Sequence, residues 1–119
     1  MKEIIIKTKS YAFAIRIVRL YKYLCSEKKE YILSKQLLRC GTSVGAHIRE
    51  AEHAESRADF RHKLSVAQKE INETIYWLSL LKDTQFLIDE QYASMEKDAI
   101  ELIKMLTSII KKTKLTTNN

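Results

Sequence analysis

Apolar residues recur at every third or fourth position along most of this chain, which is the spacing that lines one face of an α-helix. Polar stretches divide the pattern into four segments, which predict helices at residues 10–26, 32–55, 57–83 and 89–113. The last two segments keep the alternation for about three heptads. Their stripes are Phe60, Leu64, Ala67, Ile71, Thr74, Leu78 and Leu81, followed by Ile88, Tyr92, Met95, Ala99, Leu102, Leu106 and Ile109.

Local signals mark the ends of these helices. The run SEKKE at residues 26–30 is a polar connection, and Ser56 with Asp59 three positions later is typical of a helix N-cap. Residues 1–9 are predicted to form a flexible N-terminal arm, and residues 113–119 a frayed basic tail.

Four amphipathic helices with short connections can bury their stripes by packing against one another. The predicted fold is therefore all-α, an up-down-up-down antiparallel four-helix bundle. A chain of 119 residues is long enough for one core and too short for two, so residues 1–119 are expected to form a single domain.

Two glycines and no proline occur in the whole chain. Gly41 and Gly45 are one helical turn apart, so both lie on the same face of the second predicted helix. We expect them at a helix crossing, where a missing side chain lets two helices approach closely. A phosphate-binding loop would need more glycines and a preceding strand.

The apolar stripes are wider than one small bundle can bury. Four residues of the third and fourth helices lie off the central line and are predicted to form an oligomer interface, because surplus apolar surface usually marks a contact site. These are Tyr76, Trp77, Leu80 and Ile103.

Positive charge is concentrated in the first half of the chain. Residues 1–63 hold 14 Lys and Arg and seven acidic residues, a net of +7, whereas residues 64–119 hold seven and eight, a net of −1. A basic surface is typical of polyanion binders, although the same charge can serve solubility alone. The candidate phosphate contacts are Arg16, Arg19, Lys22, Lys35, Arg39, Arg49, Arg57, Arg61 and Lys63.

Some of these residues have a structural alternative. Arg39 and Glu50 could form ion pairs between helices or between subunits, and we favour this structural role over a phosphate contact. Tyr11, Tyr23 and Tyr31 could stack on unpaired bases, but tyrosines at helix ends more often serve packing.

Catalytic and metal-binding patterns are weak. Glu50 with His53 and Asp59 with His62 have the acid-x-x-His spacing of di-iron bundles, but the first helix supplies no inward carboxylate. We predict no metal, no cofactor and no enzymatic activity. Cys25 and Cys40 lack metal-ligand spacing and are expected to be reduced core residues. The chain lacks a signal peptide and an apolar run of about 18 residues, so we expect a cytoplasmic protein without a membrane segment.

The stretch from Leu37 to Ala51, LLRCGTSVGAHIREA, carries a family resemblance, together with Ser56, Asp59-Phe60, Lys63, Glu70, Glu73 and Trp77-Leu78. It resembles the small four-helix bundle proteins encoded in intervening sequences of bacterial 23S ribosomal RNA genes. That family is similar in fold to the accessory variability protein of diversity-generating retroelements. The similarity runs from Phe13 to about Leu81. Cys40 replaces a usual Ser, and His47 a usual Asn.

The resemblance implies a ring-like homopentamer with a basic surface and a role with nucleic acid. For the retroelement relative it implies binding to a reverse transcriptase and its template RNA. Two function classes follow: a non-enzymatic accessory protein that binds RNA or DNA phosphates, or a protein–protein scaffold with no direct nucleic-acid contact. Clustering of the cations on one face would favour the first, and an even scatter the second.

Overall fold

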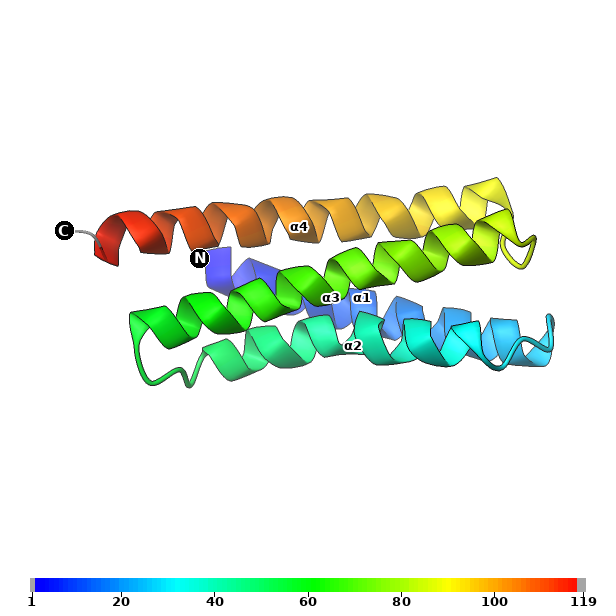
Figure 1. Ribbon diagram of the computed structural model, residues 1–119, viewed down its shortest axis with the longest axis horizontal. Coiled ribbons are helices and arrows are strands. Elements are labelled where there is room, and N and C mark those ends of the chain that lie inside the picture. Colours follow the sequence, from blue (N-terminus) through cyan, green and yellow to red (C-terminus); the bar gives the residue numbers. More distant parts are fainter. Residues whose placement is uncertain (1, 118–119) are drawn as a thin grey trace.

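Four antiparallel helices form the protein, and the computed structural model describes residues 2–117. Figure 1 shows α1 (Lys2–Ser26), α2 (Leu33–Ala51), α3 (Arg57–Asp83) and α4 (Asp89–Thr117) running up and down along one axis. The bundle measures 52 × 22 × 20 Å. The predicted all-α antiparallel four-helix bundle is confirmed.

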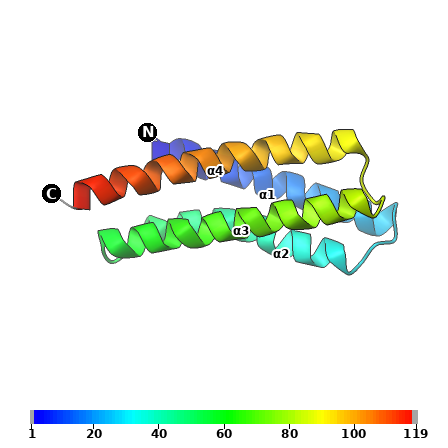
Figure 2. The same ribbon diagram turned by 45° about the horizontal axis from the view of Figure 1, so that its top comes forward.

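The helices are arranged in the order of the chain. Helices that follow one another in the chain pack against each other. The first and last helices, α1 and α4, also pack together, over the smallest of the four interfaces. Loops 27–32 and 84–88 lie at one end of the bundle, which we call the two-loop end (Figures 1 and 2). Loop 52–56 and both chain termini lie at the opposite end.

The core consists of the apolar stripes that the periodicity predicts. Ile17, Leu24, Leu37 and Val44 are fully buried in α1 and α2, as are most stripe residues of α3 and α4. Phe60 and Tyr92 are half-buried, and Ile88 is the exposed member of the predicted stripes of α3 and α4, since 58% of it is exposed. It lies in the loop before α4 begins, where helical spacing no longer applies.

The helix α1 begins much earlier than the pattern predicts. The expectation of a flexible arm over residues 1–9 is wrong for residues 2–9, which are helical. Ile6 is 1% exposed and shares a small hollow with Ile48 and Ile109, while Lys2 Nζ donates to Ser108 Oγ at 2.7 Å. Sequence periodicity missed this segment because only one of its three consecutive isoleucines faces the core.

The other helix ends differ less from prediction. α2 ends at Ala51, so residues 52–55 belong to the connection. α4 continues to Thr117, which contradicts a frayed tail from residue 113, and residues 118–119 lie outside the described chain. The predicted cap of α3 is confirmed, because the Asp59 backbone N–H donates to Ser56 Oγ at 3.0 Å. No helix in the described residues is long and apolar enough to cross a membrane.

Both glycines face α1, but with different clearance. A Cβ on Gly41 would lie 2.7–2.9 Å from three side-chain carbons of Ile17. A Cβ on Gly45 would lie 3.4 Å from the Ser10 backbone oxygen, which is an ordinary contact. Gly41 is therefore the point of closest approach between α1 and α2.

Candidate nucleic-acid interface

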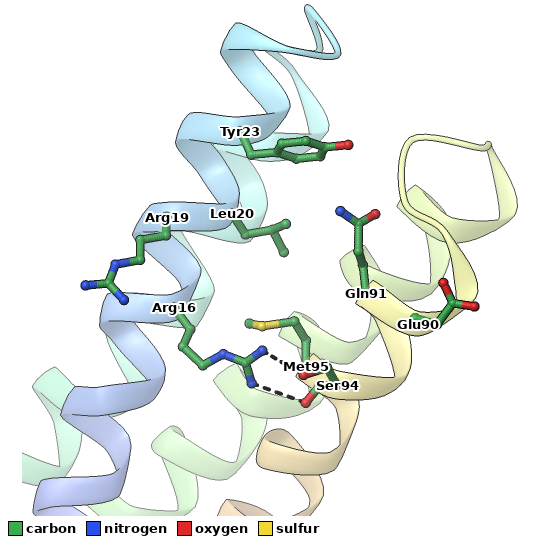
Figure 3. A pocket seen from close by; sticks show the side chains of 8 residues that line it. All are labelled: Arg16, Arg19, Leu20, Tyr23, Glu90, Gln91, Ser94 and Met95. Atoms are coloured by element: carbon green, nitrogen blue, oxygen red, sulfur yellow. Dashed lines mark hydrogen bonds between the residues drawn. The ribbon is translucent and has the colours of Figure 1, made fainter.

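The cations that the sequence singles out do not share one face. Arg16 lies between α1 and α4, where it donates to Asp98 Oδ2 at 2.6 Å and to Ser94 Oγ at 2.7 Å. Figure 3 shows its guanidinium directed at Ser94, while Arg19 points away from α4. Arg16 therefore ties α1 to α4.

Arg39 lies on the other side of the bundle, between α2 and α3. Its guanidinium pairs with Glu73 and, at 3.4 Å, with Glu70. Trp77 Nε1 donates to the same Glu73 carboxylate at 3.0 Å. Hydrogen bonds from Trp77 and Arg39 hold the pKa of Glu73 below its usual range, and the Glu73 carboxylate raises that of Arg39. The structural role that we favoured for Arg39 fits this geometry.

Further cations join helices near the end opposite the two-loop end. Lys63 Nζ is 3.4 Å from Glu50 Oε1, and Lys7 Nζ is 2.7 Å from Glu52 Oε1. The hydrogen bond from Lys7 is the main cause of the lowered pKa of Glu52. The nearby positive charge of Arg49 also lowers this pKa. Arg57 and Arg61, at the start of α3, also have interaction partners.

A different set of cations is left without acidic partners. Within the described chain they make no ion pair, and they follow one another from the last turns of α1 through loop 27–32 to the first turn of α2. We call residues 19–35 the basic segment, and its cations are Arg19, Lys22, Lys28, Lys29 and Lys35. Arg19, Lys22 and Lys35 are among the contacts predicted from sequence, whereas Lys28 and Lys29 are not, because their run is also typical of a polar connection.

The loop inside the basic segment is held by a buried carboxylate. Glu30 is 8% exposed, and its Oε1 accepts the backbone N–H of Ser34 at 2.7 Å. Its Oε2 accepts the N–H groups of Ile32 at 3.1 Å and Leu33 at 3.0 Å. The carboxylate thus caps the start of α2, where N–H groups lack helical partners. The negative charge of Glu30 is used inside the fold and does not neutralise the surrounding lysines.

Apolar and aromatic side chains stand beside these lysines. Tyr31 is 51% exposed and Ile32 is 76% exposed. Tyr23 is half-buried and lines a shallow hollow of about 500 Å³ between α1 and α4, together with Leu20 and Met95 (Figure 3). The surface therefore combines unpaired cations with ring and aliphatic groups.

Acidic side chains of α3 and α4 border the basic segment at the two-loop end. Asp83, Asp89 and Glu90 are exposed at the same two-loop end. Lys82 lies 3.8 Å from Asp83 Oδ1 and also sits over the ring of Tyr92. A polyanion approaching this end would meet attraction only on the α1–α2 side.

The predicted oligomer residues are partly accessible. Tyr76 is 58% exposed and packs edge-to-face on Trp77, with ring centroids 5.0 Å apart. Trp77, Leu80 and Ile103 are half-buried. Ile100 on α4 adds another exposed apolar side chain.

The described residues form no candidate metal site, and the two cysteines differ in burial. No group of three His, Cys, Asp or Glu side chains there is placed to hold a metal ion. Glu50, His53 and Asp59 line one hollow, but Glu50 pairs with Lys63 and Asp59 accepts the Glu55 N–H. Cys40 is buried, which raises its thiol pKa, whereas Cys25 is only half-buried, so its expected place in the core is wrong.

The fold and the motif residues can now be compared with known proteins. The model of the 23S rRNA-intervening sequence protein family matches residues 2–108. The chain belongs to this family. The resemblance carried by the Leu37–Ala51 stretch is thereby confirmed, and the family match also includes the early part of α1.

A solved structure supports the same assignment. The chain is similar to a crystal structure of a protein with unknown function from the S23 ribosomal protein family of Bacteroides thetaiotaomicron. The two share 58% sequence identity with a TM-score of 0.92, over 93% of this chain and 99% of that one. Comparison with curated proteins gave no match. The family description names no catalytic activity.

Proposed function

We propose that this protein is a non-enzymatic accessory protein that binds RNA or DNA through phosphate contacts of the basic segment. The observation that carries the proposal is the run of five cations between residues 19 and 35 that have no acidic partner in the described chain. Phosphate recognition needs cations that are not already neutralised, and their binding is accompanied by counterion release.

The proposal moves the site away from several residues that the sequence favours. Arg16, Arg39 and Lys63 already pair with carboxylates of neighbouring helices. Using them for phosphate would require breaking those pairs. Arg19, Lys22 and Lys35 remain in the site, and Lys28 and Lys29 join it.

We also propose that the protein works in the cytoplasm as a homo-oligomer, a ring-like pentamer being the form that the family resemblance implies. Exposed Tyr76 and Ile100 support an apolar contact between subunits. Repetition of the basic segment in each subunit would strengthen the field that attracts a polyanion. We propose a nucleic-acid enzyme such as a reverse transcriptase as a further partner.

A filter-binding titration at several salt concentrations tests the nucleic-acid proposal. Lys28→Glu/Lys29→Glu should weaken binding and make the logarithmic salt dependence shallower by about 0.7 per lost contact on single strands. The matched control is Lys69→Glu/Lys104→Glu, which changes the net charge equally at exposed positions of α3 and α4. It should weaken binding much less.

Two results would count against the proposal. Equal losses in both double variants would show that net charge alone matters and that the basic segment is not a site. No binding by the wild type at low salt would leave the scaffold function as the better account. The scaffold alternative has its own support in exposed Tyr76 and in the ion pairs that use up many of the cations.

A further inference from the structure

The loop of the basic segment presents two neighbouring apolar side chains to solvent. Tyr31 is 51% exposed and Ile32 is 76% exposed. Loop 52–56 at the opposite end, with the sequence EHAES, carries no large apolar side chain. Loop 84–88 exposes one large apolar side chain, Ile88, so the adjacent pair in the basic segment is the larger apolar contact surface.

This loop is fixed in one conformation by its own hydrogen bonds. The Glu30 carboxylate accepts three backbone N–H groups, the Glu30 N–H donates to Leu24 O at 3.0 Å, and Ser34 Oγ donates to Glu30 O at 2.8 Å. Lys29 has a φ of 54°, which costs energy for a residue with a side chain. The backbone on both sides of exposed Tyr31 is therefore already ordered, so binding there would lose little backbone entropy.

The charges around Tyr31 suit a chain of phosphates. Lys28 and Lys29 precede it and Lys35 follows one turn into α2, all without acidic partners in the described residues. An exposed ring flanked by cations is the arrangement that proteins use for unpaired nucleotides, because the base stacks on the ring while neighbouring phosphates meet the cations.

We propose that Tyr31 is a stacking platform and that the ligand class of the basic segment is single-stranded or looped nucleic acid. The inference rests on the proposed function and narrows it. In a regular duplex both faces of each base are covered by neighbouring base pairs, so Tyr31 has nothing to stack on. Ile32 supplies apolar contact next to the stacked base.

Fluorescence anisotropy with two labelled probes tests this assignment. One probe is an oligouridylate, which stays unpaired, and the other is a mixed-sequence RNA duplex of equal length. Tyr31→Ser should weaken binding of the oligouridylate about 5- to 150-fold, the range expected from the loss of one base–aromatic stack. Binding of the duplex should change less than about twofold, because its phosphate contacts remain.

Aromatic replacements separate stacking from other roles of the tyrosine. Tyr31→Phe and Tyr31→Trp should keep the affinity for the oligouridylate, since both retain a ring. Tyr11→Ser is the matched control, because Tyr11 is 63% exposed and lies on α1 toward the opposite end of the bundle. It should bind both probes like the wild type.

The outcomes distinguish failure of the inference from failure of the function. If Tyr31→Ser binds both probes like the wild type while Lys28→Glu/Lys29→Glu still weakens them, the stacking assignment is wrong and the phosphate site stands. If Tyr31→Phe loses as much as Tyr31→Ser, the hydroxyl and not the ring is responsible. If the wild type binds neither probe but binds polyglutamate in a Tyr31-dependent manner, the surface serves an acidic protein partner and both proposals are overturned.

Discussion

Glu30 shows how a single charged residue can be structural inside a basic surface. Burial alone would raise its pKa, but the backbone N–H groups of Leu33, Ser34 and Ile32 outweigh burial and hold the pKa below the ordinary 4.5. Its ionised form is therefore favoured by folding. The carboxylate both caps α2 and sets the shape of the loop that presents Tyr31.

Replacing Glu30 tests this role through its pH dependence. Glu30→Gln should lower the free energy of unfolding at pH 7 by about 1.5–3 kcal/mol, because the amide keeps one acceptor oxygen and its NH2 group would face a backbone N–H that the carboxylate accepts. A lowered folded-state pKa means that the stabilisation is present above pH 4.5 and is lost as pH falls through the folded-state value. Urea unfolding of both proteins should show a constant difference from pH 7 to about 5 that narrows at lower pH.

The exposed Glu27 in the same loop provides the control for that measurement. Glu27→Gln should change stability by less than about 0.5 kcal/mol at any pH. A Glu30→Gln difference that does not narrow below pH 4.5 would show that the loss is steric and not electrostatic.

Gly41 and Gly45 are equivalent in spacing but not in surroundings. Gly41→Ala should destabilise the protein by about 1–3 kcal/mol, because the added methyl overlaps fully buried Ile17. Gly45→Ala should be neutral or slightly stabilising, since the contact with Ser10 is ordinary and Ala is the better helix former. Thermal unfolding of both variants checks the order. Ile17→Ala removes all three overlapping carbons, so the double variant with Gly41→Ala should lose less stability than the sum of the two single variants, and a purely additive double variant would exclude the proposed overlap.

At the scale of the elements, the first two turns of α1 are part of the packed bundle. Ile6→Ala should lower the free energy of unfolding by about 2–5 kcal/mol, as truncation of a buried isoleucine does. Ile4→Ala, at a position 64% exposed, should cost less than about 0.5 kcal/mol. Chemical unfolding curves of the two variants measure these changes in the free energy of unfolding. Equal small losses in both would show that residues 2–9 add little to the stability of the bundle.

For the whole molecule, charge and apolar surface are distributed unequally. Ion pairs hold α4 to α1 through Arg16 and Asp98 and α3 to α2 through Arg39 and Glu73. Five cations without an ion pair in the described residues lie in the basic segment near the two-loop end, while exposed Tyr76 lies on α3. This separation would allow an oligomer to assemble through one surface and bind a polyanion through another.

Light scattering tests the proposed assembly. The wild type should show a mass several times the 13.9 kDa of one chain, near fivefold for the pentamer. Tyr76→Glu should shift the population toward the monomer, because the charge cannot be buried in an apolar contact without a large cost. Tyr11→Glu, at a similarly exposed tyrosine, should leave the mass unchanged. Dissociation by Tyr11→Glu alone would place the contact on α1 and α2.

The sequence alone determined the four helices, most of their buried stripes, the capped start of α3 and the family. These properties are local, since a period of 3.6 residues or a cap three positions before its partner can be read within one segment. The Leu37–Ala51 motif is likewise contiguous. The local pattern failed where local cues conflict with packing, as at Ile6 and Ile88.

Only the tertiary structure decided which cations remain available. Arg16 and Arg19 are one turn apart on the same helix, yet Arg16 meets Asp98 and Arg19 meets no acidic partner in the described chain. The partners of Arg39 are more than 30 positions away, and Glu30 turned inward instead of neutralising Lys28 and Lys29. Charge pairing depends on which helices become neighbours and how they are rotated, so a count of basic residues could indicate the sign of the surface but not the place of a site.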